Sequence, residues 1–364
     1  MKITLMHDGG PISGISTYVY NILKNLQIHN NNASLYQYIL WKSQISPPDG
    51  TLIVNTPKDH SYPTLLQKII TVTDLYFGEN WHQFKNIKTG DYTILSNPAL
   101  LKLTKYINNC GVIAHDLYYL YDNMDSKLFN IYFRNQYKMF KNADFILSNS
   151  EFTKMDLVKR LNIEADKITT VYPYVDDLIF HPGESNFRNN LGISKKMKLI
   201  LSVGGEKPNK NIETVVRLMS KLPDNYILVR VGRNTSSLNL IHELDLNQRV
   251  ILKENITEIE LADIYRGSDM FVFPSLFEGF GIPVIEAMAS GVPVLGSNSG
   301  SIPEVIENSG IVANPYDTDY MAEQIQSILE NESENNRYKQ LSIKRAEFFN
   351  MENQYKQIMK ALKI

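Results

Sequence analysis

Two glutamates stand on either side of a glycine-rich turn. Glu278 precedes Gly279-Phe280-Gly281, and Glu286 lies in the apolar segment that follows. A carboxylate accepts hydrogen bonds, so it suits the hydroxyl groups of a sugar. The turn brings backbone N–H groups to the start of a helix, which is a favourable place for an anion. The pattern therefore predicts a site for a phosphate joined to sugars, as in a nucleotide sugar.

The residues around this turn predict the elements that position it. The apolar run 269–273 predicts a buried strand, which Pro274 ends. Pro283 sits where the first turn of a helix tolerates a missing N–H. Gly291 closes that helix, and Pro293 prevents it from resuming. A strand, a glycine turn and a helix are therefore expected in this order.

Residues 274–293 resemble the Glu-x7-Glu signature of the GT4 family of retaining glycosyltransferases, which have the GT-B fold. Glu278 and Glu286 match the two acids of the signature. The resemblance implies that Glu286 holds ribose hydroxyls, while Glu278 holds the transferred sugar at a catalytic position. It also implies a nucleotide-sugar-binding loop, formed by Gly279, Phe280, Gly281 and Ile282. The structural alternative is a strand-to-helix turn with an acid that the helix dipole favours.

A second glycine loop follows the strand predicted at 197–203. It resembles the family's phosphate loop, in which a basic pair binds the donor diphosphate. Lys210 matches the lysine of that pair, but Gly205 stands where the family has an arginine. Lys207 or Arg233 is expected to supply the missing charge, unless backbone amides suffice. The alternative for Lys210 is an exposed lysine at a helix start, where the dipole disfavours it.

The first half of the chain offers a glycine and a histidine for the same ligand. A strand, a glycine loop and an apolar helix over 1–26 predict the start of a doubly wound domain. The strand predicted at 111–114 delivers His115, whose imidazole can donate or accept a hydrogen bond. The resemblance implies that Gly14 meets the donor diphosphate and that His115, a catalytic residue, contacts the sugar. The alternative for Gly14 is a glycine that only lets the loop turn, and the alternative for His115 is a histidine that caps a loop.

The chain of 364 residues is long enough for two domains. The resemblance implies an α/β GT-B fold, with two facing Rossmann-like domains, a cleft between them and a C-terminal helix that crosses back to the first. We expect an acceptor-side domain at 1–176, completed by a helix at about 345–364, and a nucleotide-sugar-binding domain at 177–344. The polar stretch 177–196 is expected to link them, and 65–77 predicts a helix on the acceptor side.

Composition narrows the function and the compartment. Lys and Arg number 37 against 39 Asp and Glu, and no basic stripe stands out, which argues against a nucleic-acid partner. The single cysteine, Cys110, allows no intrachain disulfide and favours a reducing compartment. We predict no signal peptide and no membrane span, hence a cytoplasmic protein. The basic aromatic segment 128–141 leaves peripheral contact with the inner face of the membrane open, although such stripes are more often core.

The resemblance implies a metal-independent, retaining hexosyltransferase. It would move a hexose from a UDP-, GDP- or ADP-sugar to a saccharide or lipid-linked saccharide in the synthesis of glycans or cell-surface polysaccharides. No cofactor is expected besides this donor substrate, since no His, Asp and Glu cluster shows metal-ligand spacing. The donor base, sugar, acceptor, linkage and oligomeric state are left open.

Other functions stay open at this stage. A related GT-B sugar-nucleotide epimerase would need no acceptor, and a phosphorylase would bind pyridoxal phosphate through a lysine. A non-catalytic partner subunit is the other alternative, and Gly205 is its one residue-level support. A dehydrogenase is disfavoured because the first loop lacks a Gly-x-Gly-x-x-Gly fingerprint.

Overall fold

A computed structural model of the chain describes residues 1–7, 14–29, 32–38, 52–54, 90–96, 98–105, 107–121, 127–233, 235 and 237–364. The chain divides into two compact units. Unit 1 comprises Met1–Pro173 with Gln354–Ile364, and unit 2 comprises Tyr174–Asn353. The expected boundaries were after residue 176 and at about residue 345. The helix expected at 65–77 lies outside the described residues.

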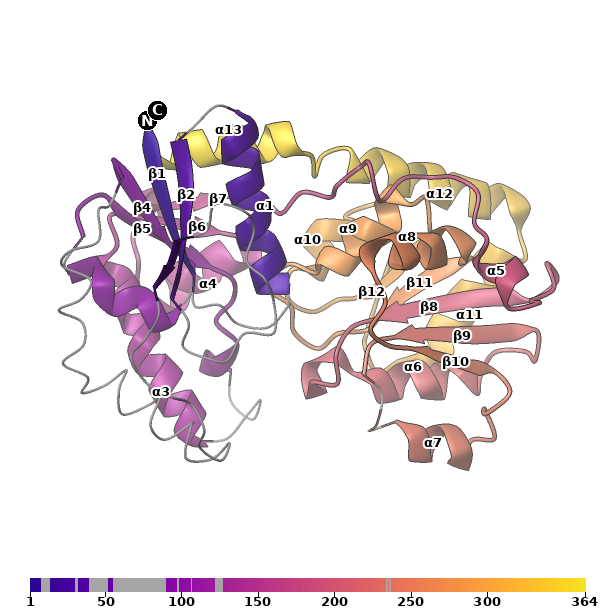
Figure 1. Cartoon of the computed structure of the whole chain (residues 1–364). Helices are drawn as coiled ribbons and strands as arrows, with labels where there is room; N and C mark the ends of the chain where they lie inside the picture. The colour runs from indigo at the N-terminus through magenta and orange to yellow at the C-terminus, as the bar shows by residue number, and fades with distance from the viewer. Residues whose placement is uncertain are drawn as a thin grey trace. The chain divides into compact units, whose positions relative to one another are not determined.

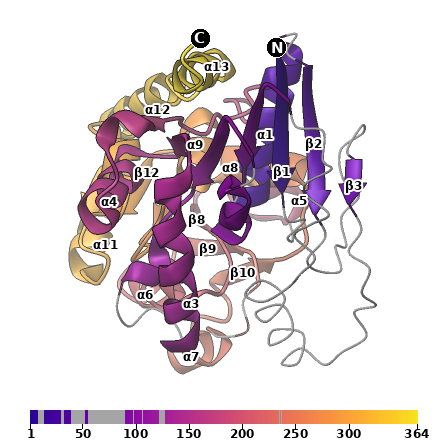
Figure 2. The same ribbon diagram turned by 90° about the vertical axis from the view of Figure 1, so that its left-hand side faces the viewer.

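Unit 1 is built on a parallel sheet of seven strands in the order β3-β2-β1-β4-β5-β6-β7, with β3 at its edge (Figure 2). The chain places β2 and β3 on one side of β1 and then continues with β4 on the other side. The pair β1/β4 is therefore the topological switch point, near which ligands of such sheets bind. The strands are β1 (Lys2–His7), β2 (Asn32–Tyr38), β3 (Leu52–Val54), β4 (Tyr92–Leu95), β5 (Cys110–Ala114), β6 (Phe145–Ser148) and β7 (Ile168–Thr170).

The helices of unit 1 include several short 3-10 segments. Residues 98–105 form one of them. Ser150 caps the helix that follows β6, because its side chain accepts a hydrogen bond from the Thr153 N–H at 3.0 Å. The helices are α1 (Gly14–Ile28), η2 (Pro98–Lys105), η3 (Tyr118–Leu120), α3 (Lys127–Tyr137), η4 (Lys138–Asn142), α4 (Glu151–Leu161), η5 (Ala165–Lys167) and α13 (Met351–Ala361).

The core of unit 1 contains part of the basic segment at 128–141. Tyr137 and Phe140 are buried there with Cys110. The rings of Tyr119 and Phe133 stack with centroids 4.0 Å apart. Burial of these rings favours the core interpretation of the stripe, and membrane contact stays a prediction.

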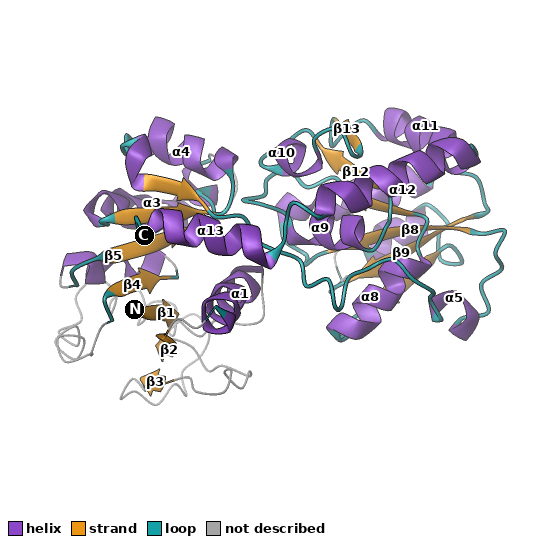
Figure 3. Cartoon of the chain, turned by 90° about the horizontal axis from the view of Figure 1, so that it is seen from above, coloured by secondary structure: helices purple, strands orange, loops and turns teal. Residues whose placement is uncertain are grey.

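The last helix, α13, packs against unit 1 beside α1 (Figure 3). The buried Asn25 amide donates to Gln354 Oε1 at 3.0 Å. The backbone N–H of Tyr172 donates to Gln357 Oε1 at 2.8 Å. These bonds tie the end of the chain to its first unit, so the expected return of the C-terminal helix is confirmed.

Unit 2 is a second parallel sheet, with six strands in the order β10-β9-β8-β11-β12-β13. Its switch point is the pair β8/β11. All four residues of β11 are buried, as expected for a parallel strand covered on both faces. The strands are β8 (Lys198–Val203), β9 (Tyr226–Val231), β10 (Val250–Lys253), β11 (Met270–Phe273), β12 (Val294–Ser297) and β13 (Ile311–Ala313).

Helices cover both faces of this sheet. In Figure 1, α8, α9 and α10 lie above it and α6 below it. Ile200, Leu228 and Met270 of the sheet share one core with Val215 of α6 and Met321 of α11. The helices are α5 (Phe187–Asn190), η6 (Pro208–Lys210), α6 (Ile212–Met219), α7 (Leu238–Glu243), α8 (Glu258–Gly267), α9 (Ile282–Ala289), α10 (Ile302–Ile306), α11 (Thr318–Leu329) and α12 (Glu332–Ala346).

The polar stretch 177–196 packs onto unit 2, so the expectation of a linker there is wrong. Phe187 is only 7% exposed. Arg188 donates to the Gly267 carbonyl at 2.7 Å and pairs with Asp269 at 2.5 Å. One aromatic ring and one arginine anchor this segment, although its composition is that of a loop.

Candidate functional site

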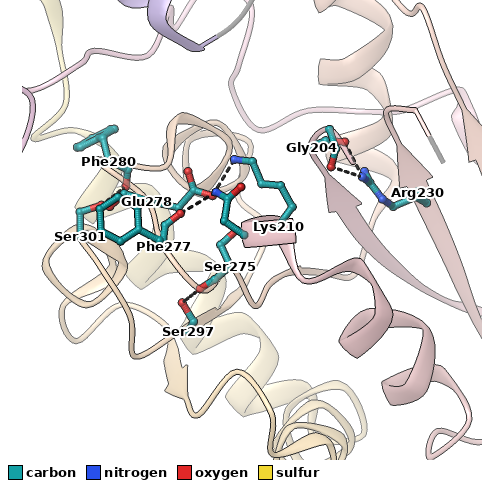
Figure 4. Close-up of polar contacts among 11 residues, drawn as sticks. Gly204, Lys210, Arg230, Ser275, Phe277, Glu278, Phe280, Ser297 and Ser301 are labelled. Carbon is teal, nitrogen blue, oxygen red and sulfur yellow. Dashed lines mark hydrogen bonds and ion pairs between the residues drawn. The ribbon is translucent and has the colours of Figure 1, made fainter. Parts of the chain in front are cut away.

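Two loops meet at the switch point of unit 2. Loop 204–211 follows β8 and loop 274–281 follows β11. Ile200 of β8 pairs with Met270 of β11, so the two loops leave the same edge of the sheet side by side. Lys210 Nζ lies 2.7 Å from Glu278 Oε1 across them (Figure 4), with the side chains 22% and 12% exposed. The structure thus brings together two residues that the sequence predicts for one site.

Lys210 links the glycine loop to the glutamate turn. A Cβ built on Gly204 would lie 3.6 Å from Lys210 Cδ, so the lysine stem runs along the glycine backbone. Its ammonium lies 5.4 Å from the centroid of the Phe273 ring. Lys210 is therefore an ordered, paired cation and not the exposed lysine of the structural alternative.

The β8 loop holds the glutamate turn through buried carbonyls. Asn209 Nδ2 donates to the Phe277 carbonyl at 2.9 Å. Asn211 Nδ2 donates to the Pro274 carbonyl at 3.1 Å. Buried carbonyls need such partners. The residues beside Lys210 thus fix the position of the turn that carries Glu278.

The segment after β12 holds the same turn from its other side. Ser297 Oγ donates to the Ser275 carbonyl at 2.6 Å, and Ser301 Oγ lies 2.8 Å from the Phe280 carbonyl (Figure 4). Gly300 has φ +61°, and a Cβ there would lie 2.7 Å from the Glu278 carbonyl oxygen. Only glycine lets the backbone approach Glu278 so closely. Gly300 and Ser301 belong to the Gly-Ser-Ile-Pro run that leads into α10, and neither is among the predicted site residues.

The rest of the glycine turn is compact. Gly281 has φ +97° at the start of α9, and a Cβ there would lie 2.7 Å from Ile302 Cδ1. Phe280 is 3% exposed, with its ring 5.5 Å from that of Phe349. Gly279 is buried, and Ile282 is the partly exposed first residue of α9. A ligand would therefore meet the backbone of Phe280 and not its ring.

Glu286 lies on α9, the helix that begins at the turn. The Tyr265 hydroxyl is 3.1 Å from Glu286 Oε2 and also 3.1 Å from the Pro283 carbonyl. Burial raises the pKa of the Glu286 carboxyl to about 7, with a further rise from the charge of Glu258 and an opposing effect of the Tyr265 hydrogen bond. At neutral pH the group is thus close to the midpoint of its titration.

A buried arginine, Arg230, contacts the loop at Gly204. The sequence alone does not predict it as a site residue. Arg230 is 1% exposed, and its guanidinium donates to the Gly204 carbonyl at 2.5 Å (Figure 4). Of the expected substitutes for the missing arginine, Lys207 is exposed. Arg233 is 77% exposed and lies 3.8 Å from Glu206.

In unit 1, His115 follows β5 and is 8% exposed. Its Nε2 lies 2.7 Å from the carbonyl oxygen of Ser96, the residue that follows β4. A carbonyl only accepts, so Nε2 carries a proton in this contact. The Tyr18 ring and the imidazole are nearly perpendicular, with their centroids 5.7 Å apart. Gly14 is the exposed first residue of α1.

Comparison with known families covers almost the whole chain. Residues 12–177 match the family described as "Glycosyltransferase Family 4", and residues 184–345 match "Glycosyl transferases group 1". The chain belongs to the family 4 glycosyltransferases. The match to "Glycosyl transferases group 1" includes Lys210, Glu278 and Glu286.

Individual relatives agree with this assignment. The chain is 32% identical to the O-antigen chain mannosyltransferase RfbU of Salmonella typhimurium over 191 residues, which are 50% of this chain and 50% of that protein. The chain therefore matches about half the length of this relative. Sucrose-phosphate synthase from Thermosynechococcus elongatus superposes with a TM-score of 0.82 at 20% identity, covering 100% of this chain and 98% of that one. HepE from Anabaena in complex with UDP-glucose gives 0.79 at 16% identity, covering 100% and 99%. These likenesses show the GT-B fold.

Among the described residues, no helix combines the length and apolar character needed to cross a membrane. The same residues contain no group of three or more His, Cys, Asp or Glu side chains that could hold a metal ion.

Proposed function

We propose that the chain is a retaining hexosyltransferase that acts on a UDP-, GDP- or ADP-sugar. The acceptor would be a saccharide or lipid-linked saccharide, in glycan synthesis. The observation that carries the proposal is the Lys210–Glu278 pair at the switch point of unit 2. One loop offers a cation for a diphosphate, and the neighbouring loop offers a carboxylate for sugar hydroxyls. The family, the mannosyltransferase relative and the UDP-glucose bound to HepE support this function.

Donor binding would exchange the partners of this ion pair. Lys210 would turn to the diphosphate and Glu278 to hydroxyls of the transferred sugar. Glu286, in its ionised form, would accept hydrogen bonds from ribose hydroxyls. In unit 1, His115 would contact the transferred sugar, and Gly14 would lie close to the diphosphate.

The transfer would replace one bond at the anomeric carbon by another. As the bond to the phosphate oxygen breaks, the sugar gains oxocarbenium character and the leaving diphosphate gains negative charge. Lys210 and the loop amides would stabilise that charge without rearrangement. The acceptor oxygen would attack from the face that the diphosphate leaves, and its proton would pass to the departing phosphate oxygen. The anomeric configuration is thereby retained.

A donor panel tests this function. UDP, GDP, ADP and their hexose conjugates are added to the chain, and the thermal midpoint is recorded. A ligand that binds only the folded state raises the midpoint by mass action. We expect one nucleotide series to do so, and its sugar to be transferred to a saccharide acceptor with the donor's anomeric configuration in the product. No shift with any series would contradict the proposal. Conversion of the sugar nucleotide without any acceptor would point to an epimerase.

A further inference from the structure

The glycine loop after β8 has a cation below its backbone, although position 205 carries none. The Arg230 guanidinium donates to the carbonyls of Gly204, at 2.5 Å, and Gly205, at 3.3 Å. It also donates to the carbonyls of Ser202 and Val231. One buried side chain therefore collects four carbonyls where β8 and β9 end.

This arrangement fixes the direction of two backbone N–H groups. In a planar trans peptide, the C=O of one residue and the N–H of the next point in opposite directions. The carbonyls of Gly204 and Gly205 point at Arg230, so the N–H groups of Gly205 and Glu206 point away from it. Gly205 is exposed, and a Cβ built there would meet no described atom within 4 Å. The backbone at Gly205 is thus exposed to a ligand.

The end of β9 is shaped to permit this contact. Gly232 has φ +118°, and a Cβ there would lie 2.0 Å from the Gly204 carbonyl oxygen. Any side chain at 232 would push the carbonyl away from the guanidinium. The Gly204 N–H donates to the Val231 carbonyl at 3.0 Å, which completes the junction between the two strands.

Arg230 also keeps its charge in this buried place. Burial lowers its pKa to about 10, while the nearby Glu206 opposes that fall. The guanidinium is therefore protonated at neutral pH. Its donors polarise the two peptide groups in the direction that makes their N–H groups better partners for an anion.

We propose that Arg230 is a positioning residue that replaces the arginine missing at Gly205. It holds the loop so that the Gly205 and Glu206 amides, together with Lys210, bind the donor diphosphate. The inference rests on the proposed function, because it concerns the diphosphate of the same donor. It deepens that function by assigning the diphosphate to backbone amides instead of a loop side chain.

Arg230→Lys tests the inference, with Arg249→Lys as the matched control. Arg249 binds the carbonyls of Leu222, Pro223 and Tyr226, and so does the same kind of work at the opposite end of β9. Calorimetry measures the Kd of each variant for the diphosphate among UDP, GDP and ADP that the unaltered chain binds, and for its nucleoside. A lysine keeps the charge but cannot hold four carbonyls. We expect at least about tenfold weaker diphosphate binding in Arg230→Lys, with nucleoside affinity within about twofold. Arg249→Lys should change neither.

A second measurement needs no variant. Hydrogen–deuterium exchange of the unaltered chain should show slower exchange of the Gly205 and Glu206 amides with the nucleoside diphosphate, and no such change with the nucleoside. This decides the inference even if Arg230→Lys does not fold. Unchanged exchange at these amides, or equal losses in both arginine variants, would overturn it. If the unaltered chain binds no nucleoside diphosphate, the proposed function fails and takes this inference with it. If Arg230→Lys binds the nucleoside diphosphate as tightly as the unaltered chain does, the inference fails while the proposed function stands.

Discussion

At the scale of residues, the site of unit 2 consists of charges that already have partners. Lys210 and Glu278 satisfy each other at 2.7 Å, and Tyr265 donates to Glu286. A donor has to compete with these contacts before it gains its own. Removing one member of a partly buried charge pair of this kind is destabilising, because the remaining charge loses its partner. Single substitutions should therefore affect binding and turnover differently.

The first prediction concerns Glu278→Gln. The variant loses a charged acceptor for the sugar, and the loss of such a contact is worth about 1.5–3 kcal/mol. Turnover should fall about 10- to 100-fold. The affinity for the nucleoside diphosphate should not weaken, because Lys210 is released from its partner. Glu307→Gln is the control, since Glu307 also pairs with a cation, Arg345, at 2.9 Å. Steady-state turnover and calorimetry measure the two effects, and a Glu278→Gln variant with full turnover would refute the assignment.

The second prediction concerns the pH dependence of Glu286. Burial raises its pKa from 4.5 to about 7, so the folded chain binds more protons than the unfolded chain between these values. The stability that this group contributes is complete below about pH 4.5 and is lost as the pH rises through about 7. Glu286→Gln should remove this part of the dependence. Thermal midpoints of both proteins from pH 5 to 8 measure it, and parallel curves would show that Glu286 does not titrate as described.

Nucleotide affinity should depend on pH in the opposite sense. The ionised carboxylate of Glu286 would accept hydrogen bonds from ribose hydroxyls with two charged oxygens, whereas protonation removes the charge and makes one oxygen a donor. Affinity should thus increase as the pH rises through about 7 in the unaltered chain. The increase should be absent in Glu286→Gln, whose amide does not titrate.

At the scale of elements, the switch point explains why residues far apart in sequence meet. The loops after β8, β11 and β12 leave one edge of the sheet, and side chains from the first and third hold the second. The side chains of Asn209 and Ser301 donate hydrogen bonds to backbone carbonyls of the second loop, and Gly300 leaves space for its backbone. The position of Glu278 is therefore a property of three loops.

Gly300→Ala tests this element-scale support. The new Cβ would lie 2.7 Å from the Glu278 carbonyl oxygen, and φ +61° is unfavourable for alanine. We expect a loss of about 1–3 kcal/mol in the free energy of unfolding, together with lower turnover because Glu278 moves. Gly192→Ala is the control, since φ is +64° there but no described atom lies within 4 Å of the new Cβ. Chemical denaturation and turnover separate the effects. If both variants kept full turnover, Gly300 would have no role in placing Glu278.

The same scale shows what the sequence can predict. Buried parallel strands such as β11 are continuous apolar runs, and Pro283 and Gly291 mark the ends of α9, so these elements follow from local pattern. The contact of Arg230 with Gly204 joins the ends of two strands, and that of Ser301 with Phe280 joins two loops. No local spacing encodes such contacts. The segment 177–196 misleads for a related reason, since Phe187 and Arg188 anchor a stretch of loop-like composition.

At the scale of the whole molecule, two doubly wound units occur in one chain, and α13 from the end of the chain belongs to the first. Each unit places predicted site residues at the carboxyl ends of strands at or beside its switch point. In unit 1, Nε2 of His115 donates to the residue after β4. In unit 2, Lys210 and Glu278 come from the loops after β8 and β11. Lys210 in unit 2 should therefore bind the donor diphosphate.

The measurement that tests this claim most directly is a calorimetric titration of Lys210→Ala with the nucleoside diphosphate that the unaltered chain binds. Loss of one charged contact predicts an affinity about 10- to 100-fold weaker. Lys221→Ala is the control. Lys221 also pairs with a carboxylate, that of Asp319 at 2.8 Å, but this pair lies away from the switch point. Binding should be weaker in Lys210→Ala alone. The thermal midpoint of this variant without ligand should fall, because the partly buried Glu278 loses its partner. Equal affinity in Lys210→Ala and the unaltered chain would contradict the binding role of Lys210.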